Sequence, residues 1–178
     1  MIRRSLLSLL IVSLLVVIQS TWLEVISIYG VKPDISLIVI VYIAFKNPGL
    51  QGQTIGFASG LLQDSISMSP LGVNAFIKTS VALVANLLSG KFYFDRLLMP
   101  GLFGFVSILL KSLYLYFLSL FFGDKIIVYQ LFSSTLWLEA LYTAIASPIL
   151  FLILRPIDRF IVPIDRKSKR LNSSHGKL

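Results

Sequence analysis

Long apolar runs separated by short polar turns dominate this sequence. Six apolar segments can be marked by their residue limits: 5–28, 35–45, 54–66, 73–89, 97–122 and 131–154. A helix needs about 20 consecutive apolar residues to cross the hydrocarbon core of a bilayer, and most of these segments approach or exceed that length. The pattern therefore predicts an all-α, polytopic membrane protein with six transmembrane helices.

The segments 35–45 and 54–66 are shorter than a perpendicular span requires. They hold 11 and 13 residues, against the ~20 of a full span. Two structures fit this length: short helices extended by their polar flanks, or a re-entrant pair that is buried in protein. Both structures leave the two ends of the chain on the same side of the membrane.

The composition excludes an ordinary soluble domain. Hydrophobic residues make up 56% of the 178 residues and charged residues 13%, and the mean hydropathy is +0.87. Too few polar side chains remain to cover the surface of a water-soluble globule. Cysteine is absent and the one histidine, His175, lies in the polar tail, so we expect no disulfide, thiol nucleophile, metal site or cofactor in the membrane.

The distribution of basic residues predicts the orientation. A net charge of +8 would suggest nucleic acid in a soluble protein, but here the basic residues are concentrated in alternate loops. With six spans, the start, the turn after the second segment, the loop at 90–96 and the tail share one side and carry 12 basic residues, whereas the other side carries only Lys32 and Lys125. By the positive-inside rule both termini are cytoplasmic.

The chain divides into a predicted transmembrane domain, 1–157, and a basic cytoplasmic tail, 158–178. The basic residues of this tail have two possible roles. They bind anionic membrane lipids, or they only determine the topology. The last nine residues have the composition of a structureless or non-native extension, so no function is assigned to His175.

Five ionisable side chains fall inside the predicted spans, all in the outer half or at the midplane: Glu24, Asp64, Lys78, Lys111 and Glu139. Each costs at least ~2.5–3.5 kcal/mol in hydrocarbon unless it is paired or hydrated. Their depths predict two ion pairs, Lys111 with Glu139 and Asp64 with Lys78, and leave Glu24 without an obvious partner. Two roles remain open: links between helices, or an outward-facing polar cavity for a ligand or a partner's segment.

Small residues and prolines indicate local geometry. Gly56 and Gly60 form a GxxxG pattern, which allows another helix to approach closely. Pro148 lies inside the last segment, where it frees a backbone carbonyl and is expected to kink the helix. Asp64 precedes a serine-rich turn, so we expect it either to pair with Lys78 or to accept hydrogen bonds from backbone N–H groups.

The region 32–75 resembles the family of the rod shape-determining protein MreD. The resemblance rests on a Lys-Pro-Asp before the second segment, a glycine-rich third segment that ends in aspartate, and a Pro-Leu-Gly-Val-Asn-Ala turn. The candidate partner-binding or structural residues are Pro33, Asp34, Gly56, Gly60, Asp64, Pro70, Leu71, Gly72 and Asn74.

The resemblance implies a non-catalytic scaffold of the cell-shape and peptidoglycan elongation machinery in the bacterial inner membrane. Its partners would be MreC, MreB, and RodA with its penicillin-binding transpeptidase, together with membrane lipids, and nucleic acid is not expected. The family is also grouped with the substrate-binding S components of energy-coupling-factor transporters. The alternative is therefore a subunit that binds a vitamin-like small molecule.

Overall fold

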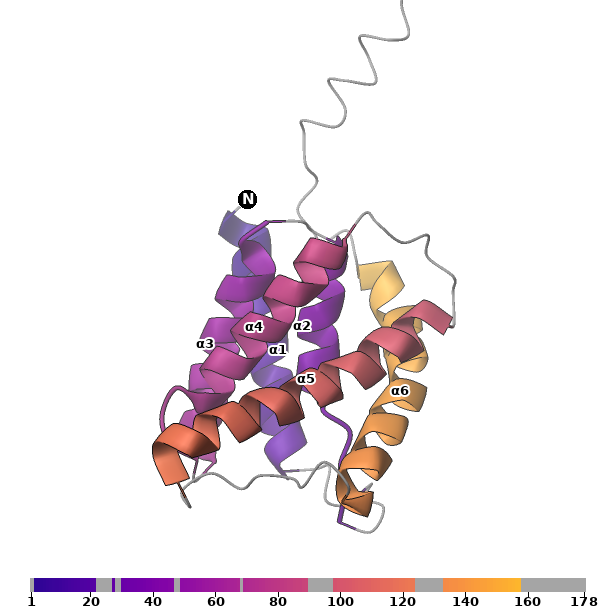
Figure 1. Cartoon of the computed structure of the whole chain (residues 1–178). Coiled ribbons are helices and arrows are strands. Elements are labelled where there is room, and N and C mark those ends of the chain that lie inside the picture. The colour runs from indigo at the N-terminus through magenta and orange to yellow at the C-terminus, as the bar shows by residue number, and fades with distance from the viewer. Residues whose placement is uncertain are drawn as a thin grey trace, which may run out of the picture.

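The computed structural model of this chain is built from α-helices (Figure 1). The structure describes residues 2–21, 27, 30–46, 49–67, 69–89, 98–123 and 133–157. In these residues lie six α-helices and a short 3-10 helix, namely α1 (Ile2–Thr21), α2 (Ile35–Lys46), α3 (Gln51–Ile66), α4 (Val73–Leu88), α5 (Leu98–Phe122), α6 (Ser134–Leu154) and η2 (Arg155–Ile157). The predicted all-α class is confirmed, and each predicted apolar segment corresponds to one helix.

Two helices are long and apolar enough to cross a membrane. They are the stretches Leu98–Phe121 of α5 and Ser134–Leu154 of α6. The stretches Leu6–Gln19, Ile35–Lys46 and Val73–Leu88 are also apolar but shorter. The third predicted segment becomes a helix of 16 residues because Gln51, Gly52 and Gln53 extend its N-terminal end.

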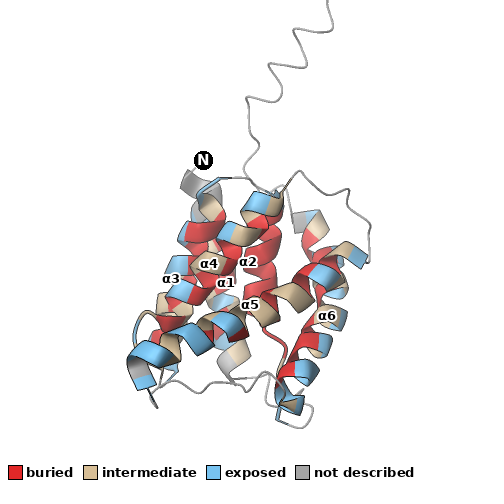
Figure 2. Cartoon of the chain, viewed as in Figure 1, coloured by how far each residue is buried: buried red, intermediate tan, exposed pale blue. Residues whose placement is uncertain are grey.

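Helix α2 lies at the centre of the bundle. Every residue from Ser36 to Phe45 is buried, and α2 packs against all five other α-helices. A helix that is apolar on all sides is stable only where it is enclosed. This enclosure explains why a segment too short for a perpendicular span is almost uniformly apolar (Figure 2).

The remaining helices form two close pairs around α2. The most extensive contacts join α3 to α4 and α5 to α6, and α5 runs obliquely across the bundle (Figure 1). The N-terminus of α1 and the C-terminal end of α6 lie at the same end of the bundle. The turn between α3 and α4 and the start of α2 lie at the opposite end.

Small residues bring α5 and α6 together. A Cβ at Gly104 would overlap the Ser147 side chain, and one at Gly101 would lie 3.2 Å from the carbonyl oxygen of Ala144. That carbonyl is the one which Pro148, four residues later, cannot bond. The helix continues past Pro148 as one element, with Gly101 leaving space beside the freed carbonyl. The predicted kink remains a prediction.

The outer faces of α1, α5 and α6 are strongly apolar. Large exposed side chains on them include Leu10, Leu14, Leu120, Phe121 and Ile145. Figure 2 shows exposed positions along the outward sides of α5 and α6 and buried positions on the sides that face α2. Soluble monomers rarely present such large contiguous apolar surfaces, whereas surfaces in contact with lipid are apolar.

Candidate functional site

Two buried carboxylates organise the end of the bundle that lies away from the N-terminus. Asp64 lies near the C-terminal end of α3, and Asp34 immediately precedes α2. A carboxylate is stable in such a place only when hydrogen bonds or cations compensate for the lost water. The two residues obtain this compensation in different ways.

Asp64 is held by neutral donors from the turn between α3 and α4. Its Oδ1 accepts from the backbone N–H of Asn74 at 3.0 Å, from Asn74 Nδ2 at 2.8 Å and from Ser69 Oγ at 3.2 Å. Its Oδ2 accepts from the backbone N–H groups of Gly72 at 2.9 Å and Ala75 at 3.3 Å. Since the first N–H groups of a helix have no partner inside it, Asp64 caps α4 from the neighbouring helix.

This geometry decides between the two roles expected for Asp64. The capping role is confirmed. The pairing of Asp64 with Lys78 is wrong, because the Lys78 ammonium donates to Ser36 Oγ at 2.8 Å, and no ion pair joins Lys78 to Asp64 within the described residues. Asp64 faces the start of α4, whereas the Lys78 side chain extends from α4 toward α2.

The turn that Asp64 stabilises has a defined backbone. Gly72 has a φ of +99°, a left-handed conformation that favours glycine, and the N–H of Val73 donates to the Pro70 carbonyl at 3.2 Å. The Leu71 side chain is 73% exposed. Pro70, Gly72 and Asn74 therefore shape this turn, while Leu71 presents an apolar side chain outward.

Gly56 and Gly60 set the distance between α3 and α4. A Cβ at Gly60 would overlap the backbone of Asn74 and Ala75, and one at Gly56 would lie 3.0 Å from the Lys78 carbonyl oxygen. The packing role that the GxxxG pattern predicts is confirmed by this close approach. Gly60 and Asp64 lie one turn apart, so close packing and capping act on the same end of α4.

Asp34 connects the start of α2 to other helices. Its Oδ1 accepts from the backbone N–H of Leu37 at 3.1 Å, the geometry of a helix N-cap, and from Ser36 Oγ at 3.0 Å. Gln19 of α1 donates to the same oxygen at 3.3 Å and accepts from the N–H of Ser36 at 3.0 Å. The Pro-Asp motif before the second segment thus begins α2 and fixes it against α1.

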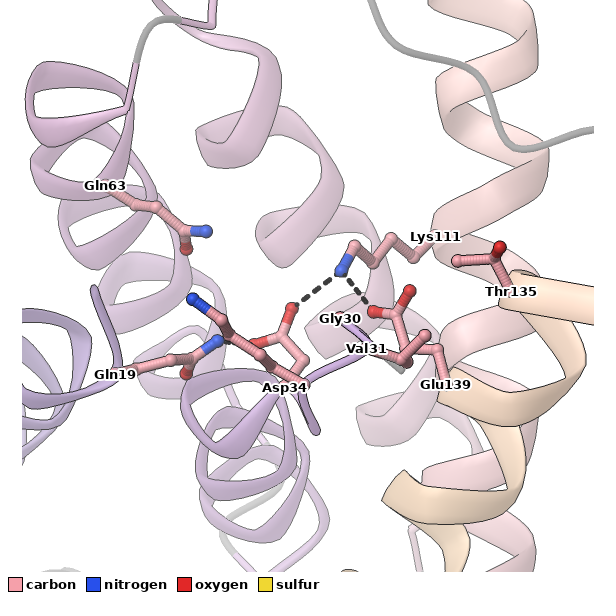
Figure 3. A pocket seen from close by; sticks show the side chains of 9 residues that line it. Gln19, Gly30, Val31, Asp34, Gln63, Lys111, Thr135 and Glu139 are labelled. Atoms are coloured by element: carbon pink, nitrogen blue, oxygen red, sulfur yellow. Dashed lines mark hydrogen bonds and ion pairs between the residues drawn. The ribbon is translucent and has the colours of Figure 1, made fainter. Parts of the chain in front are cut away.

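Lys111 of α5 bridges two carboxylates. Its Nζ lies 2.7 Å from Glu139 Oε1 on α6 and 3.1 Å from Asp34 Oδ2 (Figure 3). The predicted pair of Lys111 with Glu139 is confirmed. Asp34, which the sequence indicated only as part of a family motif, is a second partner of the same ammonium.

Lys78 adds a second buried cation to this group. It is only 1% exposed, and its hydrogen bond to Ser36 Oγ links it to Asp34 through that hydroxyl. Asp34, Glu139, Lys78 and Lys111 carry two negative and two positive charges, so the group is neutral overall. We call these four residues and Ser36 the Asp34 centre.

A small polar cavity adjoins the Asp34 centre. Its volume is about 190 Å³, and it is lined by Gln19, Gly30, Val31, Lys32, Asp34, Gln63, Lys111, Thr135 and Glu139. Figure 3 shows side chains converging on it from several helices. The amide oxygen of Gln63 is buried and has no hydrogen-bond partner in the described part of the chain. The cavity can therefore hold water or a small polar group that donates a hydrogen bond.

Several expected features lie outside the residues that the structure describes. These are Glu24 and the whole basic tail 158–178, which includes His175. Within the described ranges, no group of three or more acidic, histidine or cysteine side chains could hold a metal ion.

Sequence patterns did not indicate Gln19, Ser36 or Gln63 as members of the site. Polar residues next to a motif were the only available signal: Ser36 follows Asp34 by two positions, and Gln63 directly precedes Asp64. Gln19 lies 15 residues before Asp34 in another helix, and no spacing rule connects them.

Comparison with known protein families gives a match over most of the chain. The family described as rod shape-determining protein MreD matches residues 2–157, which include all six α-helices and η2. No curated protein and no solved structure matches this sequence.

Proposed function

Because the chain belongs to the MreD family of rod shape-determining proteins, we propose that it is a non-catalytic membrane scaffold of the machinery that determines rod shape. The family places it among bacterial membrane proteins and gives it a role in cell shape. The proposal adds to this a scaffold role, a membrane topology and a set of partners.

The proposed topology has six membrane-crossing helices and cytoplasmic termini in the bacterial inner membrane. It is supported by the apolar α5 and α6, by the shared end of the bundle at which α1 begins and α6 ends, and by the basic loops of the sequence. An even number of crossings returns the chain to the side on which it began. The short helices α2 and α3 would cross as parts of the bundle, enclosed by their neighbours.

The observation that carries the scaffold function is the close pairing of α3 with α4. Gly56 and Gly60 bring the two backbones into contact, and Asp64 fixes the start of α4 with five hydrogen bonds. The family-motif residues thus support a fixed surface, as a protein needs when its task is to hold partners in position. We propose MreC as the direct partner, with MreB, RodA and its penicillin-binding transpeptidase in the same assembly.

The cavity is the feature that favours the alternative of a vitamin-binding S-component subunit. Pockets for ligands of drug size usually measure about 300–1,000 Å³ and are mostly apolar and aromatic. This cavity measures about 190 Å³, and none of its lining residues is aromatic. Its size and lining therefore support a scaffold better than a vitamin-binding subunit.

Shape complementation tests the proposal. In a rod-shaped bacterium depleted of its own MreD, this chain should restore rod shape and should co-purify with MreC of the same organism. An Asp64→Ala variant should lose both properties, while Ser65→Ala, which changes an exposed neighbouring hydroxyl, should retain both. Stoichiometric vitamin in protein purified without MreC, together with failure to bind MreC, would favour the transporter alternative.

A further inference from the structure

We infer that the cavity beside the Asp34 centre binds the ammonium or guanidinium group of a basic side chain on an apolar segment of a partner membrane protein. This inference rests on the proposed scaffold function and specifies the chemistry of the contact. It is based on the hydrogen bonds that the polar atoms at the cavity already form, on the polar atoms that have no partner, and on the residues around them.

The cations at the cavity already have partners. Lys111 bonds both Asp34 and Glu139. Lys32, the other lysine in the lining, also has an interaction partner. Lys78 lies behind Ser36 and does not line the cavity. The lining therefore offers no ready cation to an incoming anion.

The open polar atoms at the cavity include two acceptors beside the amide nitrogen of Gln63 and the hydroxyl of Thr135. Gln63 Oε1 is buried without a hydrogen-bond partner, and in the described residues Glu139 forms its hydrogen bond through Oε1 alone, which leaves Oε2 open. Figure 3 shows Gln63 on α3 and Glu139 on α6 on opposite sides of the contact between Asp34 and Lys111. A buried acceptor without a donor costs about 1–3 kcal/mol, so a group carrying several N–H donors would relieve the cost.

The lining is neutral overall, with two lysines and two carboxylates, but its open charged atom, Glu139 Oε2, favours a cationic donor over an anion. An anion could accept from the amide nitrogen of Gln63 but would face the free carboxylate oxygen of Glu139, which repels it. A cation would form a charge-assisted hydrogen bond with the free oxygen of Glu139, and bonds of this kind are stronger than neutral ones. Lysine and arginine side chains end in several N–H donors and have no acceptor.

The volume limits the ligand to one side-chain end group. The cavity of about 190 Å³ is smaller than the about 300–1,000 Å³ that is usual for pockets of drug-sized ligands. This accommodates an ammonium or guanidinium with its last methylenes. It leaves no room for a folded loop.

Exposed apolar residues that neighbour the cavity residues in sequence suit an apolar segment as the carrier of the cation. Ile18 precedes Gln19, Trp137 and Leu138 precede Glu139, and Ile66 follows Gln63 by three positions; all four are exposed. A partner segment that covered these positions would bury apolar surface around a single basic residue. Such a residue needs a buried acceptor, because an unpaired charge in a membrane is costly.

The first test uses n-butylammonium as a probe for the chain in nanodiscs, with saturation-transfer NMR and empty nanodiscs subtracted. Wild-type protein should bind it saturably. Gln63→Leu should weaken binding by about tenfold, because it removes one hydrogen bond from a charged donor. Gln63→Glu should strengthen binding, and Ser65→Ala should leave it unchanged. All four ionic residues of the Asp34 centre stay in place in these variants.

Four outcomes of this test would overturn the site, three with wild-type protein and one with a variant. With wild-type protein they are no saturable binding of butylammonium, equal binding of butanol or butyrate, and displacement of butylammonium by an equal concentration of sodium ions. A Gln63→Leu variant that binds as well as wild type would overturn it also.

The second test uses full-length MreC in the same nanodiscs. Gln63→Leu should reduce its affinity by about tenfold, and replacing one basic residue of MreC with Met should cause the same loss, without further loss when both changes are combined. If MreC binds wild type and Gln63→Leu equally, the assignment to this partner is wrong while the scaffold function stands. If MreC does not bind the wild-type chain, the proposed function fails. Whether the cavity binds a cation is then decided by the butylammonium experiment alone.

Discussion

The Asp64 cap and the Asp34 centre bury carboxylates at the same end of one bundle by different means. Asp64 accepts five hydrogen bonds from neutral groups, all between residues 69 and 75. Asp34 accepts from α1, from its own helix and from a lysine 77 residues later, and that lysine also holds Glu139. One carboxylate is satisfied locally, and the other depends on the assembled bundle.

This difference separates a structural role from a binding role. Every oxygen of Asp64 is engaged by donors that fix a turn, so little remains for a ligand. The Asp34 centre adjoins a cavity with two open acceptors, Gln63 Oε1 and Glu139 Oε2. Substitutions at the first should therefore lower stability and weaken partner binding only through that loss, whereas some substitutions at the second should change binding without changing stability.

The largest effect should come from removing the cation that two carboxylates share. Lys111→Met leaves Asp34 and Glu139 buried without their common partner, and breaking a buried ion pair in this way costs about 3–5 kcal/mol. Unfolding in mixed micelles with increasing SDS measures this loss. Combining the change with Asp34→Asn and Glu139→Gln should restore most of the stability, since no uncompensated charge remains. A loss below about 1 kcal/mol for Lys111→Met would contradict the assigned ion pairs.

A smaller but substantial effect should come from the contact that supports the cap. Gly60→Ala places a Cβ into the backbone of α4, and overpacking of this kind costs typically up to about 3 kcal/mol. Gly56→Ala meets the Lys78 carbonyl at 3.0 Å and should cost less. The same unfolding measurement ranks the two variants. Equal stability of Gly60→Ala and wild type would show that the helices do not approach as closely as described.

Substitution of Asp64 distinguishes hydrogen bonding from charge at the cap. Asp64→Ala leaves helix N–H groups without their acceptor and should cost about 2 kcal/mol. Asp64→Asn keeps one acceptor oxygen for Asn74 and Ser69 but loses the bonds to Gly72 and Ala75, so its unfolding midpoint should lie between those of Asp64→Ala and wild type. If Asp64→Asn is as unstable as Asp64→Ala, charge rather than hydrogen bonding holds the turn.

The smallest change in stability should come from Gln63. Gln63→Leu removes an acceptor that has no protein partner among the described residues and that water in the polar cavity can satisfy, so the free energy of unfolding should change by less than about 0.5 kcal/mol. The unfolding midpoint in SDS should match that of Ser65→Ala. A loss of about 2 kcal/mol or more would mean that Gln63 is a structural residue, and the comparison between the two regions would lose its basis.

The number of residues that separates two interacting side chains in the sequence explains which contacts could be predicted. The Asp64 cap was predictable because its donors follow within 11 residues in a recognisable turn. The pair of Lys111 with Glu139 was predictable from depth on helices that are neighbours in the chain. The helix content followed from the apolar runs, and the enclosure of α2 explains why its segment is short and apolar throughout.

The rest of the Asp34 centre depends on helix rotation and on contacts between distant segments. Lys78 was expected to face Asp64, because both residues flank the same turn, but its side chain extends toward Ser36, 42 residues earlier. Depth along a helix can be estimated from residue number, whereas the face on which a side chain lies depends on neighbours that a single sequence does not identify. For the same reason Gln19 and Gln63 were missed.

The central claim is that the cavity is the functional region and that the Asp64 cap supports it. The most direct test asks whether the Gln63→Leu variant can restore rod shape. The measurement is the ratio of cell length to width in a bacterium depleted of its own MreD, with unfolding midpoints confirmed equal to wild type. We expect Gln63→Leu to leave cells round and Ser65→Ala to restore rods. Rods of wild-type proportions with Gln63→Leu would contradict the claim.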